Sequence, residues 1–291
     1  WVQVRVDRDL LGYPGEPVLT AGRTAFLTQT PGIPPRLRGD SPEYAAAISA
    51  GATVFEAMSS LDPLFTAHNR LPFYTWGGER CVLPAGATRA TLRGDQAATL
   101  RAGQVLIFVE ERGPVSGQAA DADPSRRHVV RLTEVRATAD LLGGFLEPEP
   151  RDAGGEGVPL TEIAWGVEDA LPFAFCLATL DAHGGAPITD VSVALGNVLL
   201  VDHGRTIGGP EGEALPAVPA PTLRYAAAED RDGEPGFVPL RYVPHLRQQP
   251  LTQVAQVMKT VSDLGREQAI LVPFDAGASA AAALTPPSAA M

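Results

Sequence analysis

Short stretches in which apolar and polar residues alternate are the main structural signal along this chain. Val2, Val4 and Val6 alternate with polar neighbours, as in a strand with one buried face. The run 105–109 is apolar throughout and follows Gly103, which predicts a strand buried on both faces. Further strands are expected at 25–28, 53–58, 88–93, 129–135, 161–165, 188–195, 198–201 and 268–274.

Glycine and proline separate these stretches. The 30 glycines and 27 prolines make up roughly a fifth of the 291 residues, well above ordinary usage. Such frequent interruption indicates short strands and ordered loops, and it excludes a helical bundle. Gly196-Asn197 lies between two strand candidates and predicts a two-residue connection, because both residue types tolerate a positive φ. The spacing predicts a mainly β fold, either a barrel or a sandwich.

Two segments carry helical signals. Ser41-Pro42-Glu43 supplies an N-cap, a first-turn proline and an acidic residue, so it predicts a short helix through 45–49. Thr252 is a candidate N-cap for a second helix that ends at Gly265. The apolar face of this second helix would consist of Val254, Val257, Met258, Val261 and Leu264.

A proline-rich segment follows the predicted β domain. Residues 206–250 interleave prolines with large apolar residues, a combination that flexible linkers rarely have. Two interpretations stay open: a long extended arm that lies on a partner protein, and an ordered surface loop of the same domain. The residues expected to contact a partner are Leu223, Tyr225, Phe237, Leu240, Tyr242 and Leu246.

These patterns divide the chain into four parts. We expect an N-terminal β segment with a short helix at 1–75 and a barrel-like or sandwich-like domain at 76–205. The proline-rich arm at 206–250 and a helix–strand segment with an alanine-rich tail at 251–291 follow. The chain begins inside a strand-like stretch and ends among small residues, so we expect both ends to continue in a longer protein.

Charge and cysteine content narrow the classes of partner. The formal net charge is −11 at pH 7, whereas proteins that bind nucleic acid or an anionic membrane surface are normally basic. No apolar run approaches the roughly 20 residues that cross a bilayer. The two cysteines, Cys81 and Cys176, are too few for a disulfide framework, and the sequence leaves open whether they pair.

Candidate catalytic residues lack the patterns that their chemistry requires. The five histidines have no histidine partner at metal-binding spacing, and no paired-cysteine motif occurs. A hydrolase would have to use Cys81, His128 or His203, yet the chain has no Gly-x-Ser-x-Gly elbow. Phosphate-binding glycine loops are absent as well. We therefore expect no catalytic residue, no metal and no cofactor.

Carboxylates and aromatic residues offer two further alternatives. Glu162, Glu168 and Asp169 are candidate glycosidase carboxylates, although acidic residues around a strand are more often solvated. Trp76 and Trp165 are candidate stacking residues of a secreted carbohydrate- or surface-binding β module. With aromatic residues at only 6%, we favour a core position for both tryptophans.

The stretches Ala67–Gly77 and Cys81–Ala90 resemble the baseplate assembly proteins of contractile phage-tail-like particles. The resemblance runs in order from about residue 20 to residue 252, while 254–273 looks like an insertion. Gly78 replaces a common acid of the family and Val82 a common cysteine. The other matching stretches are 100–106, 117–124, 127–133, 170–173 and 196–204.

The resemblance implies a structural component of the baseplate wedge in a contractile injection system or tailocin. The family has no established catalytic residues to carry over. Its implied partners are a wedge partner, hub and sheath-proximal proteins, and further copies of the chain in a ring. Nucleic acid and membrane insertion are not implied. The implied location is the bacterial cytoplasm during assembly, followed by release as part of a particle.

Overall fold

The computed structural model describes most of the first 204 residues and several short segments after them. The described residues are 1–142, 157–181, 185–204, 217–220, 222–224, 236–238, 241–243, 256–263, 266–273 and 279–280.

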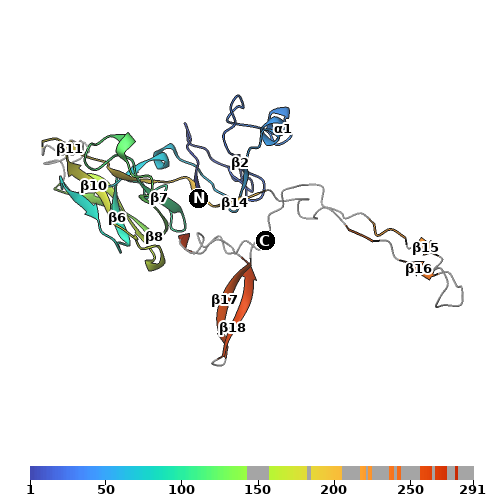
Figure 1. Ribbon diagram of the computed structural model, residues 1–291. Helices are drawn as coiled ribbons and strands as arrows, with labels where there is room; N and C mark the ends of the chain where they lie inside the picture. Colours follow the sequence, from blue (N-terminus) through green and yellow to red (C-terminus); the bar gives the residue numbers. More distant parts are fainter. Residues whose placement is uncertain are drawn as a thin grey trace.

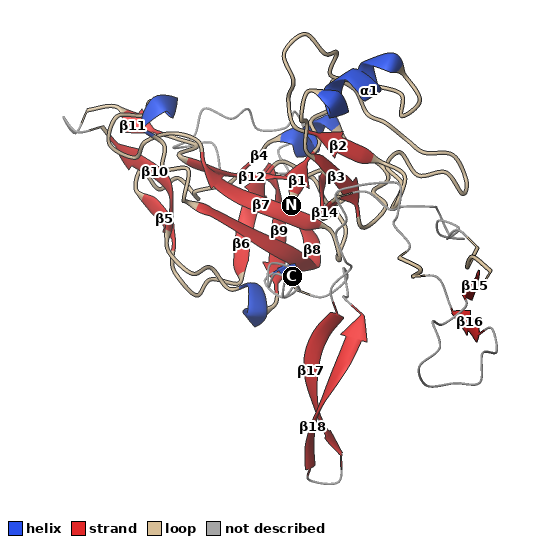
Figure 2. Cartoon of the chain, turned by 45° about the vertical axis from the view of Figure 1, so that its right-hand side comes forward, coloured by secondary structure: helices blue, strands red, loops and turns tan. Residues whose placement is uncertain are grey.

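A six-stranded antiparallel sheet forms the body of the protein (Figure 1). In order across the sheet, its strands are β4 (Leu71–Pro72), β12 (Ser192–Leu195), β7 (Val105–Glu110), β8 (Arg127–Asp140), β9 (Val158–Trp165) and β6 (Arg89–Arg93). Phe73, directly after β4, forms an isolated bridge with Leu92 in β6. The sheet therefore curls into a half-barrel whose first and last strands approach each other (Figure 2). This confirms the predicted mainly β fold.

A three-stranded sheet covers the open side of the half-barrel. Its order is β11 (Pro187–Ile188), β10 (Phe175–Leu180) and β5 (Cys81–Leu83). Phe175 and Leu177 of β10 join the main hydrophobic core, in which Phe108 and Leu106 of β7 are fully buried. Val105 to Val109 are buried except for the partly exposed Ile107, which agrees with a strand covered on both faces.

A small N-terminal lobe lies beside the half-barrel. A three-stranded sheet and one helix build it: β14 (Val201–His203), β3 (Val54–Ala57), β2 (Ala25–Leu27) and α1 (Pro42–Ser49). The helix is confirmed, and its N-cap Ser41 accepts a hydrogen bond from the Tyr44 N–H at 3.2 Å. Strand β1 (Val2–Gln3) pairs with β13 (Val198–Leu199). The 3₁₀ turns are η1 (Thr66–Asn69), η2 (Ala119–Asp121) and η3 (Val167–Asp169).

Gly196-Asn197 is not a hairpin turn. Asn197 has the expected positive φ of 52°, but β12 before it pairs with β4 and β7, whereas β13 after it pairs with β1. The Asn197 amide hydrogen-bonds both backbone groups of Phe65, accepting from its N–H at 3.2 Å and donating to its carbonyl at 2.8 Å. The hydrogen bonds to Phe65 hold Asn197 where the chain passes from the six-stranded sheet to the β1–β13 pair.

The helix expected from Thr252 is wrong. Strand β17 (Gln256–Asp263) pairs antiparallel with β18 (Arg266–Pro273) along its whole length. The apolar residues repeat with a period near 3.6, as in a helix, but the segment is rich in β-branched residues, which favour strands. The segment therefore forms a strand that pairs with β18. The strand expected at 268–274 is confirmed as β18.

The expected arm falls mostly outside the described residues. Within it, β15 (Thr222–Arg224) pairs with β16 (Gly236–Val238), and this register sets Leu223 opposite Phe237. Tyr242 is half-buried. The other three expected contact residues, Tyr225, Leu240 and Leu246, lie outside the described residues. The β15–β16 and β17–β18 pairs each form a separate two-stranded sheet.

Candidate functional site

A groove of about 400 Å³ lies between β5 of the three-stranded sheet and strands β6, β8 and β9 of the half-barrel. The chain runs along β6 as far as Tyr74, whose N–H donates to the Thr91 carbonyl at 2.8 Å. It then turns away at Trp76 and enters β5. The polar and aromatic lining includes Tyr74, Trp76, Cys81, Arg89, Arg136 and Glu162.

Trp76 occupies the edge of this groove in a strained conformation. Its φ is +56°, in a region that costs a residue with a side chain roughly 1–2 kcal/mol. Its indole is 52% exposed and meets the Tyr74 ring edge-on at 5.3 Å. The buried Tyr74 donates its hydroxyl to Asp140 Oδ2 at 2.8 Å, so the ring that supports Trp76 is itself held in place. Strain of this kind is often found at binding sites.

The two tryptophans do not form a common platform. Trp165 is 3% exposed and packs edge-on against Phe108 at 5.2 Å, which confirms its predicted core position. The core position predicted for Trp76 is wrong, because the left-handed turn directs its indole out of the barrel. Of these two tryptophans, only Trp76 is therefore placed to stack on a ligand.

Other residues of the groove include a charge pair and a thiol. Arg136 of β8 forms an ion pair with Glu162 of β9, and this contact raises the pKa of Arg136. Both cysteines are free, and burial raises the pKa of the Cys81 and Cys176 thiols. Such thiols stay protonated at neutral pH, so Cys81 is poorly suited to act as a nucleophile.

The other candidate catalytic residues have separate contacts. His128 Nε2 lies 3.0 Å from the Asp169 carbonyl oxygen, and the His203 ring meets Phe55 in the N-terminal lobe at 5.6 Å. Asp169 is 1% exposed and accepts backbone N–H groups, whereas Glu162 pairs with Arg136. In the part of the chain that the structure describes, no cluster of three or more His, Cys, Asp or Glu side chains suits a metal ion.

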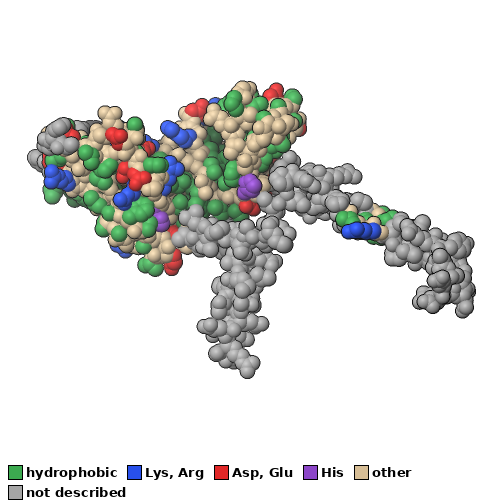
Figure 3. Space-filling view, in the orientation of Figure 1, with side chains coloured by type: hydrophobic (Ala, Val, Ile, Leu, Met, Phe, Trp, Pro, Cys, Tyr) green, Lys and Arg blue, Asp and Glu red, His purple; other side chains and the backbone are tan. Residues whose placement is uncertain are grey.

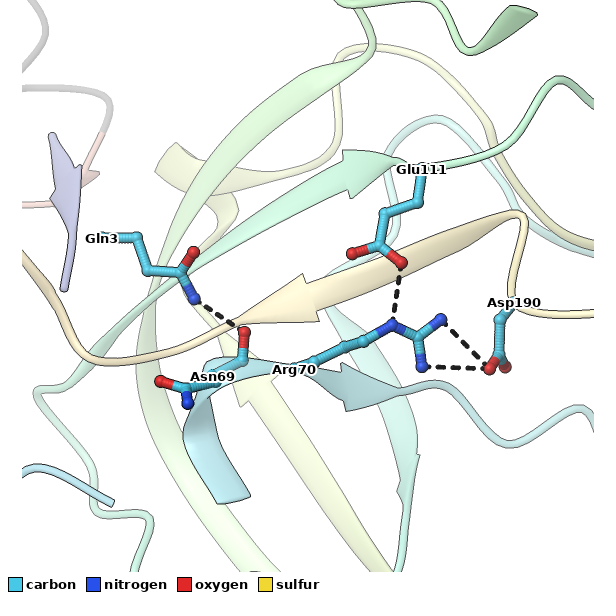
Figure 4. A network of polar contacts seen from close by, with 5 residues as sticks. All are labelled: Gln3, Asn69, Arg70, Glu111 and Asp190. Atoms are coloured by element: carbon cyan, nitrogen blue, oxygen red, sulfur yellow. Dashed lines mark hydrogen bonds and ion pairs between the residues drawn. The ribbon is translucent and has the colours of Figure 1, made fainter. Parts of the chain in front are cut away.

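A network of polar side chains joins the N-terminal segment to the half-barrel (Figure 4). Arg70 donates from Nε to Glu111 at 2.8 Å and from both terminal nitrogens to Asp190 at 3.1 and 3.2 Å. Asn69 donates to the Val6 carbonyl at 2.6 Å and accepts from the Val6 N–H at 3.0 Å. Sequence reasoning missed this network, because the partners of Arg70 lie 41 and 120 residues away.

The buried His68 beside this network gives a pH prediction. Burial lowers the pKa of His68 from 6.5 to about 4, and its Nε2 lies 2.9 Å from Thr99 Oγ1. The folded protein holds this ring neutral, whereas the unfolded chain takes up a proton below pH 6.5. The contribution of the neutral His68 to the free energy of unfolding should therefore be fully present above pH 6.5. It should fall by roughly 2–3 kcal/mol as the pH drops to 4.

The measurement is the free energy of unfolding in denaturant from pH 4 to 7, for the wild type and for a His68→Gln variant. The variant should lose that part of the pH dependence which the wild type shows between pH 4 and 6.5. Parallel pH profiles for the two proteins would contradict the assignment.

Two further surface features surround these sites. A wider groove of about 850 Å³ lies between β2, α1 and the loop that joins them, lined in part by Phe26, Ile33, Leu37 and Tyr44. On the face shown in Figure 3, basic and acidic side chains are interspersed with hydrophobic ones.

Comparisons with protein families, with curated proteins and with solved structures returned no match for this chain. Every helix in the described ranges is too short or too polar to cross a membrane. The functional conclusion below therefore rests on the sequence resemblance and on the geometry of the chain itself.

Proposed function

We propose that this chain is a structural subunit of the baseplate wedge in a contractile injection system or a phage-tail-like particle. Its function would be to bind neighbouring baseplate subunits through complementary shape and apolar contacts. The observation that carries the proposal is the ordered resemblance from about residue 20 to residue 252. The matching stretches 67–77 and 196–204 include Asn69 and Asn197, which bond to each other at 3.2 Å where the lobe meets the half-barrel.

The two separate β ribbons support a role in assembly. An isolated two-stranded ribbon is at best marginally stable in water, because it has too little surface to bury. Both β15–β16 and β17–β18 pair only within themselves among the described strands. Contact with a neighbouring subunit would supply the burial that each ribbon needs.

Removal of the segment that contains β15 and β16 tests this role. A variant in which a Gly/Ser linker of equal length replaces 206–250 should be lost from assembled particles, because its partner contacts are gone. The body should keep its unfolding transition. Particles from cells that express the variant are purified, and the chain is quantified by mass spectrometry.

Point variants sharpen this result. Leu223→Asp and Phe237→Asp place charges at opposed positions of the ribbon and should each reduce incorporation at least about tenfold, a loss near 1.4 kcal/mol. Val115→Asp, at an exposed position on the body, is the matched control and should assemble normally. Wild-type incorporation of the linker variant would reject the role of this segment.

The groove at Trp76 favours a second candidate function, the binding of a carbohydrate or another surface ligand. An exposed indole beside charged side chains suits a sugar ring, which offers an apolar face and polar edges. The positive φ does not itself require a tryptophan, since a glycine would adopt it without strain.

Trp76→Gly separates binding from stability. The unfolding free energy should stay unchanged or rise by up to about 1 kcal/mol, because the strain is relieved. Binding to a glycan array, and ligand-dependent quenching of tryptophan fluorescence, should disappear. Val82→Ala, at an exposed position on neighbouring β5, is the control. A wild-type protein that binds no glycan would exclude this candidate.

A further inference from the structure

Strand β2 forms an edge of the sheet in the N-terminal lobe. The order β14–β3–β2 leaves one side of β2 without a neighbouring strand. On its other side, the Thr24 carbonyl accepts the Ala57 N–H of β3 at 2.9 Å. Backbone groups in an antiparallel pair alternate between the two sides of a strand. Phe26 therefore faces β3 as Thr24 does, while the N–H and carbonyl groups of Ala25 and Leu27 point to the free side.

These outward groups are unpaired and unprotected. Within the described ranges, no hydrogen bond reaches the backbone N–H or carbonyl of Ala25 or Leu27. Proteins usually protect a free strand edge with a charged residue, a proline or a bulge. The stretch 24–28 contains neither a charge nor a proline, and its register with β3 has no shift. The edge of β2 is therefore open to a further strand.

The wider groove described above lies beside this edge. It is lined by residues 23–30 and, opposite them in the sequence order, by Ile33, Leu37 and Ala47 of α1. Both ribbon views place α1 next to β2 (Figures 1 and 2). One residue of a packed strand fills about 160 Å³, from its rise, the strand spacing and the sheet separation. A groove of about 850 Å³ thus has room for a strand of about five residues.

The charge at the groove indicates which segment fits. Arg23 is the one charged residue among those that line it, and in the described part of the chain its guanidinium forms no ion pair. An acidic residue in the bound segment would supply the missing partner. A second copy of β2 does not supply it, because the stretch 23–30 has no acidic residue.

We propose that β2 binds an extended segment of another protein, which adds an antiparallel strand to the free edge and lies between β2 and α1. The segment is mainly apolar, since Phe26, Leu27 and Ile33 line the groove, and it carries an acidic residue near its C-terminal end, opposite Arg23. In this mode of recognition, backbone hydrogen bonds supply affinity and the side chains supply specificity. The inference does not rest on the baseplate role, because the purified chain and a synthetic peptide test it.

The probe is a heptapeptide with blocked ends, in which valine and threonine alternate and the last residue is glutamate. Amide hydrogen exchange of the full chain is followed by NMR with and without the peptide. The N–H groups of Ala25 and Leu27 should exchange rapidly in the free chain and at least about tenfold more slowly when the peptide is bound. The Phe26 N–H, which faces β3, should change little.

Two variants at one position separate backbone recognition from other binding. Ala25→Pro removes an outward donor and leaves the pairing with β3 intact, because an edge strand tolerates proline where the N–H faces away from the sheet. It should weaken peptide binding at least about tenfold. Ala25→Val keeps the donor and is the matched control, which should bind like the wild type. Thermal unfolding checks that both variants are folded.

A charge exchange tests the acidic residue. Arg23→Glu should bind the glutamate peptide at least about threefold more weakly than the wild type does. It should bind a peptide that ends in lysine at least about threefold more tightly than the wild type does. Equal binding of both peptides to both proteins would contradict the part assigned to Arg23.

Three results would overturn the proposal. A wild-type chain that does not bind the glutamate peptide would show that the edge does not accept a strand. Slow exchange of Ala25 and Leu27 in the dilute free chain would show that the chain covers its own edge. A wild-type dimer that Ala25→Pro converts to a monomer in analytical ultracentrifugation would assign the edge to a second copy.

Discussion

Replacement of Phe108 by alanine is expected to lower the free energy of unfolding by about 3–5 kcal/mol. The Phe108 side chain is 0% exposed and stands at the centre of the half-barrel. Phe73, Trp165 and Phe175 surround it edge-on, with ring centroids at 5.0, 5.2 and 6.1 Å. Trp165 and Phe175 belong to β9 and β10, and Phe73 directly follows β4. Rings held by three different parts of the fold cannot all move inward, so the variant keeps most of the cavity.

Chemical denaturation followed by circular dichroism measures this change. Phe108→Leu should lose clearly less stability because it leaves a smaller cavity. Val115→Ala, at a position 64% exposed, should change it by less than about 0.5 kcal/mol. A loss below 1 kcal/mol for Phe108→Ala would mean that the aromatic cluster is not the centre of the core.

Replacement of Asn69 by alanine is expected to reduce the free energy of unfolding by about 2–3 kcal/mol. The Asn69 side chain satisfies both backbone groups of Val6 and accepts from the Asn197 amide. Alanine leaves these half-buried groups without their partner. The loss should loosen the first residues from the half-barrel, which faster hydrogen exchange at Val6 would report.

Gln3→Ala is the matched control. Gln3 donates one hydrogen bond to the Asn69 carbonyl at 2.7 Å, so its removal should cost only about 1 kcal/mol (Figure 4). Equal effects of the two substitutions would show that Asn69 has no special part in joining the N-terminal segment to the body.

Local signals predicted the elements that depend on neighbouring residues. The helix α1 begins where Ser41 and Pro42 indicate, because an N-cap hydroxyl and a first-turn proline act within one turn. The strand β7 follows from its apolar run, since a strand between two covered faces needs apolar residues at every position. The mainly β character followed from the same patterns.

The errors arose where distant residues decide the conformation. The segment 256–263 has an apolar pattern that fits a helix, yet its partner strand is β18. Gly196-Asn197 has the expected backbone freedom, but the partner of the Asn197 amide is Phe65, 132 residues away. The groove at Trp76 depends on the turn between β4 and β5, and these two strands pair with different neighbours, β12 and β10.

The sequence by itself therefore determined the β class, the helix cap and the fully covered central strand, because side-chain period and capping act over a few residues. Only the tertiary structure decided which strands pair, which tryptophan is exposed, and that Asp169 receives the distant Ala280. The physical reason is that hydrogen-bond partners and burial in a β protein come from residues far apart in the chain, and no local pattern encodes them.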